Sequence, residues 1–122
     1  REIKLGVIEG LTSDEIKVSH PDQLAGWRSP DLEFKIKGGE SRMDVRRRAL
    51  AALADITADD THTDIAIMTH GGTIRLLLGG LFPDDTRFTA KLPVPNTSYT
   101  VLAADDDTSW RLESLTLTPH LG

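Results

Sequence analysis

The chain has 122 residues, a formal net charge of −5 at pH 7 and no cysteine. This length suits one small domain with a single core. The lack of cysteine excludes disulfides, thiol nucleophiles and thiolate metal sites, and it is consistent with a cytoplasmic protein. The acidic balance argues against nucleic-acid binding, which needs a basic surface. No apolar run is long enough for a membrane-spanning helix, and the best one, residues 74–81, is interrupted by Arg75 and a Gly-Gly pair.

The first part of the chain predicts a short extended piece, residues 1–10, that ends in a Gly-bounded turn. Thr12, with Glu15 three residues later, is the capping-box pattern of a helix start. The His20-Pro21 step ends that helix, because the residue before proline avoids helical backbone angles. A second short helix is expected from about Pro21 to Trp27, followed by a loop over residues 28–39.

The clearest predicted helix begins after Ser41, a favourable N-cap, and runs to about Thr57. Its apolar residues recur at helical spacing and form one stripe, Val45, Ala49, Ala52, Leu53 and Ile56. Asp44 and Arg48 are four residues apart and are expected to pair weakly. We interpret the basic cluster of residues 46–48 as a solvated helix face with one or two ion pairs.

The second half of the chain predicts both strands and a helix. Residues 65–68 form an apolar run of strand length, typical of a central strand covered on both faces. The Gly-rich turn that follows leads into a predicted helix over residues 73–81, so the local order is that of an α/β fold. Residues 96–104 and 110–117 predict a hairpin, with a turn at residues 105–107.

The turn Thr69-His70-Gly71-Gly72 carries the strongest functional signal. Ligands of open α/β sheets bind where strands end, and a helix N-terminus there attracts anions. The two glycines let the backbone approach a ligand closely. A protonated His70 adds a charge and two donors, and Thr69 adds a hydroxyl. We interpret this turn as a phosphate cradle, against the simpler alternative of a histidine that only satisfies nearby backbone groups.

The remaining histidines predict no site. His20 precedes a proline, His62 lies in a polar loop and His120 lies near the C-terminus. Their spacing does not resemble a metal site, so we expect three surface residues, no metal and no cofactor.

Four segments, taken in order, resemble the histidine phosphatase superfamily, also called the phosphoglycerate mutase-like family. They are the run from Arg1-Glu2 to Glu9-Gly10-Leu11-Thr12, then Gly39-Glu40-Ser41 with Arg48 in the helix, then Ile65 to Gly72, and finally Asn96-Thr97-Ser98-Tyr99. The resemblance implies a three-layer α/β/α sandwich around a mostly parallel sheet, and phosphoryl transfer through a phosphohistidine. It also implies a small phosphorylated substrate.

The resemblance further implies that residues 1–122 are the C-terminal portion of one such domain. The family's nucleophile lies in an Arg-His-Gly motif, which this sequence lacks, and the chain begins at Arg1 rather than Met. We therefore expect the nucleophile outside this chain and the chain alone to be inactive. The family's central N-terminal strand would also be missing, which would leave the edge of residues 65–68 exposed. Such an edge invites pairing with the missing N-terminal half or with a second copy.

Two catalytic roles follow from the family pattern by position. His70 matches the histidine that contacts the phosphoryl group and stabilises its developing charge. Glu2 matches the glutamate proposed to donate a proton to the leaving oxygen, and Glu9 is the alternative acid. A bound phosphate would favour the protonated carboxyl that this role requires. For Glu40 and Arg48 we favour structural roles, a charge near the helix start and an ion pair.

Departures from the family pattern bear on the type of enzyme. Ile8 stands where the family often has tryptophan, and Gly71 is more typical of the broad phosphatase branch than of the mutases. The connection from Gly10 to Gly39 leaves little room for a mutase-type lid. The sequence favours a phosphomonoesterase, with a mutase-type isomerase, a non-catalytic phosphate-binding module and a structural fragment as alternatives. It indicates neither the physiological substrate nor the oligomeric state.

Overall fold

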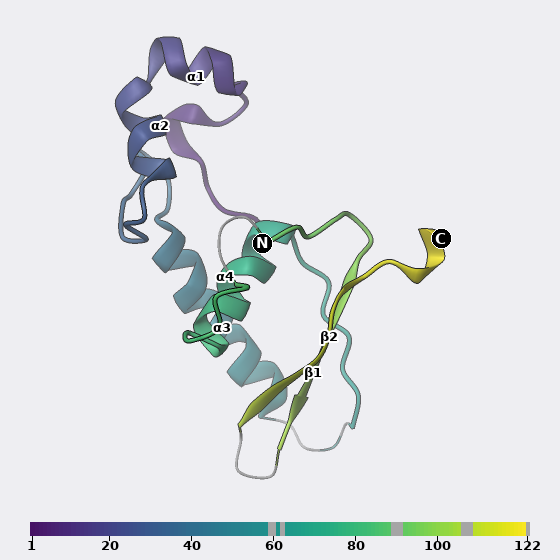
Figure 1. Cartoon of the computed structure of the whole chain (residues 1–122). Coiled ribbons are helices and arrows are strands. Elements are labelled where there is room, and N and C mark those ends of the chain that lie inside the picture. The colour runs from purple at the N-terminus through teal and green to yellow at the C-terminus, as the bar shows by residue number, and fades with distance from the viewer. Residues whose placement is uncertain (59–60, 62, 89–91, 106–108, 122) are drawn as a thin grey trace.

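A computed structural model describes residues 1–58, 61, 63–88, 92–105 and 109–121. Its elements combine helices with one small sheet, in keeping with an α/β composition (Figure 1). In chain order they are the short 3-10 helix η1 (Gly6–Ile8), α1 (Ser13–Ser19), α2 (Pro21–Arg28), α3 (Arg42–Thr57), α4 (Gly71–Leu81), β1 (Tyr99–Ala104), β2 (Trp110–Leu117) and η2 (Pro119–Leu121).

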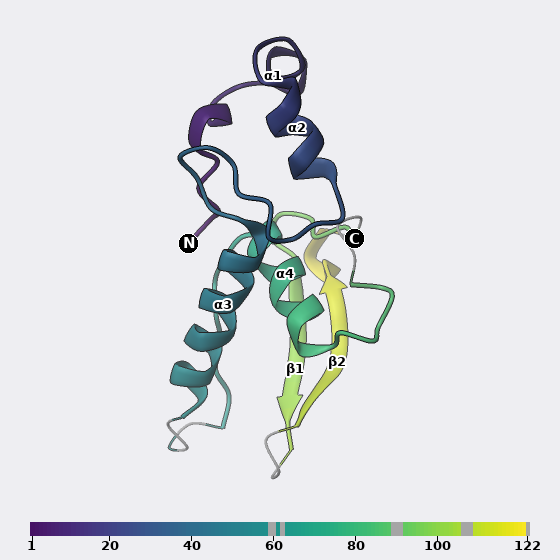
Figure 2. The same ribbon diagram turned by 90° about the vertical axis from the view of Figure 1, so that its left-hand side faces the viewer.

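Helices α1 and α2 form a lobe at one end of the molecule, beyond the start of α3 (Figures 1 and 2). The predicted capping box is confirmed: Glu15 N–H donates to Thr12 Oγ1 at 3.3 Å, and Thr12 N–H donates to Glu15 Oε2 at 2.7 Å. The second helix begins at Pro21, as expected, because proline suits the first helical position. The lobe has its own apolar core of Ile8, Ile16, Leu24 and Ile36, flanked by Leu5, Trp27 and Phe34.

Helix α3 begins where the sequence predicts. Ser41 Oγ accepts a hydrogen bond from Asp44 N–H, and the Asp44 carboxylate accepts one from Ser41 N–H, both at 3.0 Å. Val45, Ala49 and Leu53 are buried, whereas Ala52 and Ile56 of the predicted stripe are exposed, and α3 packs beside α4. The two helices lie side by side in both views.

The lobe is joined to α3 by a close crossing of two backbone segments, residues 4–7 and 37–40. Gly6 has φ +55°, and a Cβ there would lie 2.2 Å from the Lys37 carbonyl oxygen. A Cβ on Gly39 would lie 2.5 Å from the Lys4 carbonyl oxygen. Val7 N–H donates to Lys37 O, and Glu40 N–H donates to Lys4 O, both at 2.9 Å. Only glycine allows this approach, so the segment that carries Glu2 is fixed against the start of α3.

The C-terminal hairpin follows the prediction, with β1 three residues shorter at its start. β1 and β2 pair antiparallel, from Tyr99 opposite Leu117 to Ala104 opposite Trp110, with register irregularities between Tyr99 and Leu102. Most of the predicted turn, residues 106 and 107, lies outside the described residues.

The predicted strand at residues 65–68 is not part of any sheet among the described residues, and the one sheet there is antiparallel and two-stranded. Ile65, Ile67 and Met68 are 44%, 49% and 100% exposed. An isolated strand has no partner for its backbone groups, so an apolar run of strand length does not form a sheet alone. No helix in the described ranges is long and apolar enough to cross a membrane.

Replacing Ser41 with alanine should lower the free energy of unfolding by about 0.5–2 kcal/mol, because the buried cap hydroxyl would be lost from α3. Urea unfolding followed by circular dichroism measures the change. The exposed Ser13, at the first position of α1, provides the control: Ser13→Ala should change the unfolding free energy much less. Equal losses for the two variants would contradict the role given to the Ser41 cap.

Candidate phosphate-binding site

The site is built on the first turn of α4, which begins at Gly71 rather than at Thr73 as predicted. His70 is the N-cap residue, with extended backbone angles of φ −109° and ψ 153°, and its carbonyl accepts from Ile74 N–H at 3.0 Å. Its side chain is exposed and forms no hydrogen bond to the helix. The N–H groups of a first turn have no partner within their own helix, and they form the positive end of its dipole. An anion beside His70 would therefore contact the free N–H groups and lie at the positive end of the helix dipole.

The Glu2 carboxylate lies against this same turn. A Cβ built on Gly72 would be 3.2 Å from Glu2 Oε1, so the carboxylate occupies the space beside the glycine. Glu2 Oε1 also accepts a hydrogen bond from Ile3 N–H at 3.2 Å. The chain thus brings together the turn and Glu2, which are about 70 positions apart in the sequence. On the neighbouring side, a Cβ on Gly71 would lie 3.3 Å from the Val94 carbonyl oxygen.

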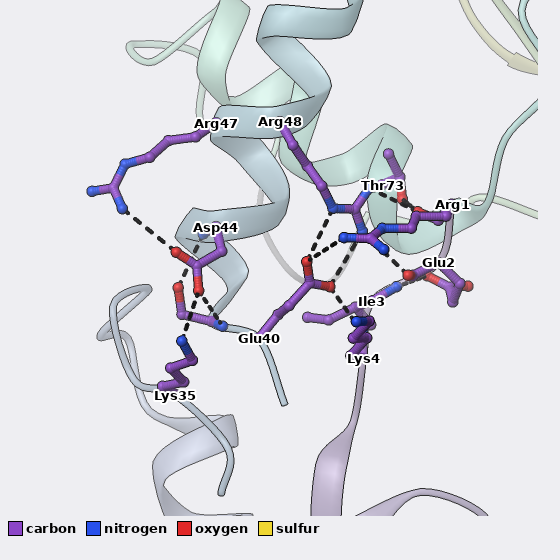
Figure 3. A network of polar contacts seen from close by, with 11 residues as sticks. Arg1, Glu2, Ile3, Lys4, Lys35, Glu40, Asp44, Arg47, Arg48 and Thr73 are labelled. Atoms are coloured by element: carbon purple, nitrogen blue, oxygen red, sulfur yellow. Dashed lines mark hydrogen bonds and ion pairs between the residues drawn. The ribbon is translucent and has the colours of Figure 1, made fainter. Parts of the chain in front are cut away.

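Arg48 holds the backbone on which Glu2 sits (Figure 3). Its Nη1 donates to the Arg1 carbonyl at 3.0 Å, and its Nη2 donates to the Glu2 carbonyl at 3.2 Å. Its partner is Glu40, whose Oε1 accepts from Arg48 Nε at 3.2 Å. The predicted pair between Asp44 and Arg48 is therefore wrong, because the Arg48 side chain extends toward the N-terminal segment instead.

Two further contacts complete this arrangement. Thr73, in the first turn of α4, donates its hydroxyl to the Arg1 carbonyl at 3.2 Å. Glu40 Oε2 accepts from Lys4 N–H at 2.9 Å. We call Glu40, Arg48 and Thr73 the Glu2 clamp. Sequence reasoning found Glu40 and Arg48 as structural residues but missed Thr73, because a bond across 72 positions leaves no local pattern.

The surroundings of the Glu40 carboxyl favour its ionised form. Burial would by itself raise its pKa, but the Lys4 N–H, the Arg48 guanidinium and the charge of Arg1 outweigh burial. The pKa of Glu40 therefore lies below its ordinary value, and the clamp carries a full charge pair at neutral pH.

The rest of the basic cluster also has partners within the chain. Arg46 Nε donates to the Leu76 carbonyl of α4 at 3.0 Å, and Arg47 pairs with Glu33 and Asp44. Only Arg47, 60% exposed, fits the solvated helix face that the sequence predicts; Arg48 is 25% exposed.

The alternative acid and the other histidines lie apart from these contacts. The Glu9 side chain is exposed and makes no hydrogen bond or ion pair with a described residue. His20 is half-buried between α1 and α2, with Nδ1 2.9 Å from Ser19 Oγ. His120 is exposed, with Nε2 3.0 Å from Thr97 Oγ1, and His62 lies outside the described residues. Within the described ranges, no three histidine or acidic side chains are grouped closely enough to hold a metal ion.

A cavity of about 520 Å³ extends from the α4 turn under the lobe. Its walls are mostly apolar, including Leu11, Ile16 and Leu24 of the lobe, and it reaches Gly72 and Arg75 of α4. Another concavity, of about 570 Å³, lies past the other end of α4. Asp84 and Asp85 line that second one without a basic side chain, so it suits a phosphate group poorly.

Comparison with known proteins identifies the family. The sequence model of the histidine phosphatase superfamily (branch 1) matches residues 1–118. A glucosyl-3-phosphoglycerate phosphatase of Mycobacterium tuberculosis (strain ATCC 25618 / H37Rv) is 31% identical over 118 residues, covering 90% of this chain and 48% of the relative. Phosphoglycerate mutase-like protein 4 of Arabidopsis thaliana is 29% identical over 114 residues, covering 93% of this chain and 48% of that protein. The chain thus spans about half the length of these curated relatives.

The structural comparison agrees. Bacillus stearothermophilus YhfR matches all of this chain and 60% of its own, with a TM-score of 0.85 and 27% sequence identity.

The charge of Glu40 should make stability depend on pH. A carboxyl whose pKa is lowered by folding contributes stability above its unfolded pKa, about 4.5, and loses that contribution as the pH falls through the folded value. We expect Glu40→Gln to cost about 1–3 kcal/mol of unfolding free energy at pH 7 and less at pH 3.5. Urea titrations at both pH values measure this.

The matched control is Glu33→Gln, which removes an exposed partner of Arg47 and should have only a small effect at either pH. A cost for Glu40→Gln that stays constant between pH 7 and pH 3.5 would show that its charge is irrelevant to stability.

Proposed function

Because the chain belongs to the histidine phosphatase superfamily, we propose that it supplies the second half of the active site of a phosphomonoesterase. The contact of the Glu2 carboxylate with the first turn of α4 is the observation that carries this proposal. It supports a role for Glu2 as a proton donor beside a turn suited to binding phosphate. Relatives named as phosphatases support the reaction class. The nucleophilic histidine would lie outside these 122 residues.

The proposed reaction has two steps. The external histidine attacks phosphorus, the bond from phosphorus to the ester oxygen breaks, and Glu2 gives its proton to that oxygen as the alcohol leaves. Water then attacks the phosphorus of the phosphohistidine, Glu2 takes a proton from the water, the bond from phosphorus to the histidine nitrogen breaks, and inorganic phosphate leaves. A protonated His70 and the α4 N–H groups stabilise the charge on the phosphoryl oxygens in both steps. Thr69, Gly71 and Gly72 form the rest of the phosphate contact, and no metal or other cofactor is needed.

The short connection between η1 and α3 favours hydrolysis over isomerisation. This connection contains only the two short helices of the lobe, and the side chains with which it lines the cavity of about 520 Å³ are mostly apolar. A mutase must retain a phosphorylated intermediate away from water, which calls for a more extensive cover. We propose a small phosphorylated metabolite as substrate and the cytoplasm as location, the latter supported by the lack of cysteine.

We also propose that residues 65–68 become a parallel strand of a three-layer sandwich when the chain meets its missing half. The apolar side chains of this segment support the idea, because in an extended segment Ile65 and Ile67 point to one face and Met68 to the other, so both faces are apolar. All three side chains are substantially exposed. A strand added beside this segment would satisfy its backbone groups, and helices on both faces would cover these side chains.

The first functional test is hydrolysis of p-nitrophenyl phosphate and of a simple alkyl phosphate by the intact natural protein. His70→Ala should lower kcat about 10²–10³-fold on both substrates, because it removes a donor to the phosphoryl oxygens. Glu2→Gln should lower kcat/KM, which reports the step in which the leaving group departs, by about 10²–10⁴-fold on the alkyl phosphate and less on the aryl ester, whose leaving group needs little proton transfer. His120→Ala, a change at an exposed histidine, serves as the control.

The outcomes separate the candidates. An intact wild-type protein that binds phosphate but hydrolyses no phosphomonoester would favour a non-catalytic binding module. Net conversion between two phosphorylated isomers without release of phosphate would favour the mutase.

The exposed apolar segment predicts the behaviour of residues 1–122 prepared alone. We expect an average mass above the 13.4 kDa of one chain in size exclusion with light scattering, because an unpaired apolar segment recruits another chain. Ile67→Lys should shift the distribution toward the monomer. Val18→Lys, on α1 at a residue 86% exposed, should not. A monodisperse, catalytically active monomer would contradict both this expectation and the proposed missing half.

A further inference from the structure

The Glu2 clamp has no part in the reaction as proposed, yet it surrounds the residue that the reaction needs. The hydrogen bonds of its three side chains are directed at other parts of the chain and not at the phosphate turn. Each instead contacts the backbone of residues 1–4 or supports a side chain that does (Figure 3).

The clamp fixes the backbone on both sides of the Glu2 side chain. Before it, the Arg1 carbonyl accepts from Arg48 and from Thr73, at 3.0 and 3.2 Å. At Glu2 itself, the carbonyl accepts from Arg48 at 3.2 Å. After it, the Lys4 N–H donates to the Glu40 carboxylate, and the Lys4 carbonyl accepts from the Glu40 N–H, both at 2.9 Å. With both flanks fixed, rotation about the Glu2 backbone is restricted.

The clamp also links this segment to the helix that bears the phosphate turn. Thr73 is the third residue of α4, directly after Gly72, against which the Glu2 carboxylate lies. Arg48 comes from α3 and Glu40 from the residues just before it, so α3, α4 and the N-terminal segment meet at one carbonyl. A shift of the segment would therefore move Glu2 relative to the turn.

The geometry requires an arginine. The guanidinium of Arg48 uses Nε for Glu40, Nη1 for the Arg1 carbonyl and Nη2 for the Glu2 carbonyl, all within one rigid plane. A lysine ammonium is a single point on a flexible stem and cannot reach those three acceptors in the same directions. Glu40, 14% exposed at its side chain, orients the plane by accepting from Arg48 Nε at 3.2 Å and from Nη2 at 3.4 Å.

We propose that Arg48, oriented by Glu40 and assisted by Thr73, is a positioning residue that holds Glu2 at the phosphate turn for proton transfer. This inference rests on the proposed function. A displacement of about 1 Å in a reacting group can cost on the order of 10²-fold in rate, so loss of the clamp has a catalytic effect beyond its structural one. The effect appears selectively in the step that needs the proton.

The experiment compares leaving groups in the intact natural protein. Arg48→Lys should lower kcat/KM on an alkyl phosphate by about 10–100-fold more than on p-nitrophenyl phosphate, the same pattern as Glu2→Gln. The double variant Glu2→Gln, Arg48→Lys should be no worse on the alkyl phosphate than Glu2→Gln alone, because a clamp without its acid has nothing to position. Arg47→Lys, at the neighbouring exposed arginine, should leave both rates unchanged.

A milder variant tests the same proposal if Arg48→Lys does not fold. Thr73→Val keeps the shape of the side chain and removes one donor to the Arg1 carbonyl, so it should show a smaller loss with the same dependence on leaving group. Thr73→Ser keeps the hydroxyl, so its rate on the alkyl phosphate should be close to that of the wild type and above that of Thr73→Val.

The results separate the two proposals. If Glu2→Gln lowers kcat/KM equally for both substrates, the assignment of Glu2 as the acid is wrong and the proposed function must be revised. If Glu2→Gln discriminates between leaving groups while folded Arg48→Lys or Thr73→Val affects both equally, the positioning role alone is overturned. Additive losses in the double variant would overturn it as well.

Discussion

The charge pair between Glu40 and Arg48 is the interaction on which the rest of the candidate site depends. Three parts of the chain converge on it: the N-terminal segment, the start of α3 and, through the Arg1 carbonyl, the first turn of α4. A partly buried pair of this kind contributes less to stability than its Coulomb attraction suggests, since both ions lose hydration. The pair orients the guanidinium plane, and through its hydrogen bonds to the Arg1 and Glu2 carbonyls it restricts the Glu2 backbone.

Local features of the structure could be read from the sequence, because their causes are local. The capping box of α1, the N-cap serine of α3, the proline at the start of α2 and the second hairpin strand depend on residues within a few positions of each other. The turn at His70 was recognisable for the same reason. Strand formation at residues 65–68 failed as a prediction because it requires a partner strand, and periodicity reports only which faces are apolar.

The contacts that assemble the site could be predicted only in part. Family resemblance predicted that Glu2 and His70 belong to one site, and in the structure the Glu2 carboxylate approaches Gly72. The residues that hold Glu2 there act through backbone carbonyls, which every residue carries and no sequence pattern marks. Arg48 was accordingly assigned to Asp44 at helical spacing, whereas its actual partners lie at positions 1, 2 and 40.

The crossing of Gly6 and Gly39 limits how this chain can change. Asparagine often tolerates positive φ, but at Gly6 its Cβ would still meet the Lys37 carbonyl, so lack of space excludes it although the backbone angle does not. The close approach at the crossing is between main-chain atoms, so no compensating side-chain change on either segment can relieve it. Cavity-lining residues such as Leu11 and Leu24 are free of this constraint. Variation in the lobe can thus reshape the cavity while the register of the Glu2 segment stays unchanged.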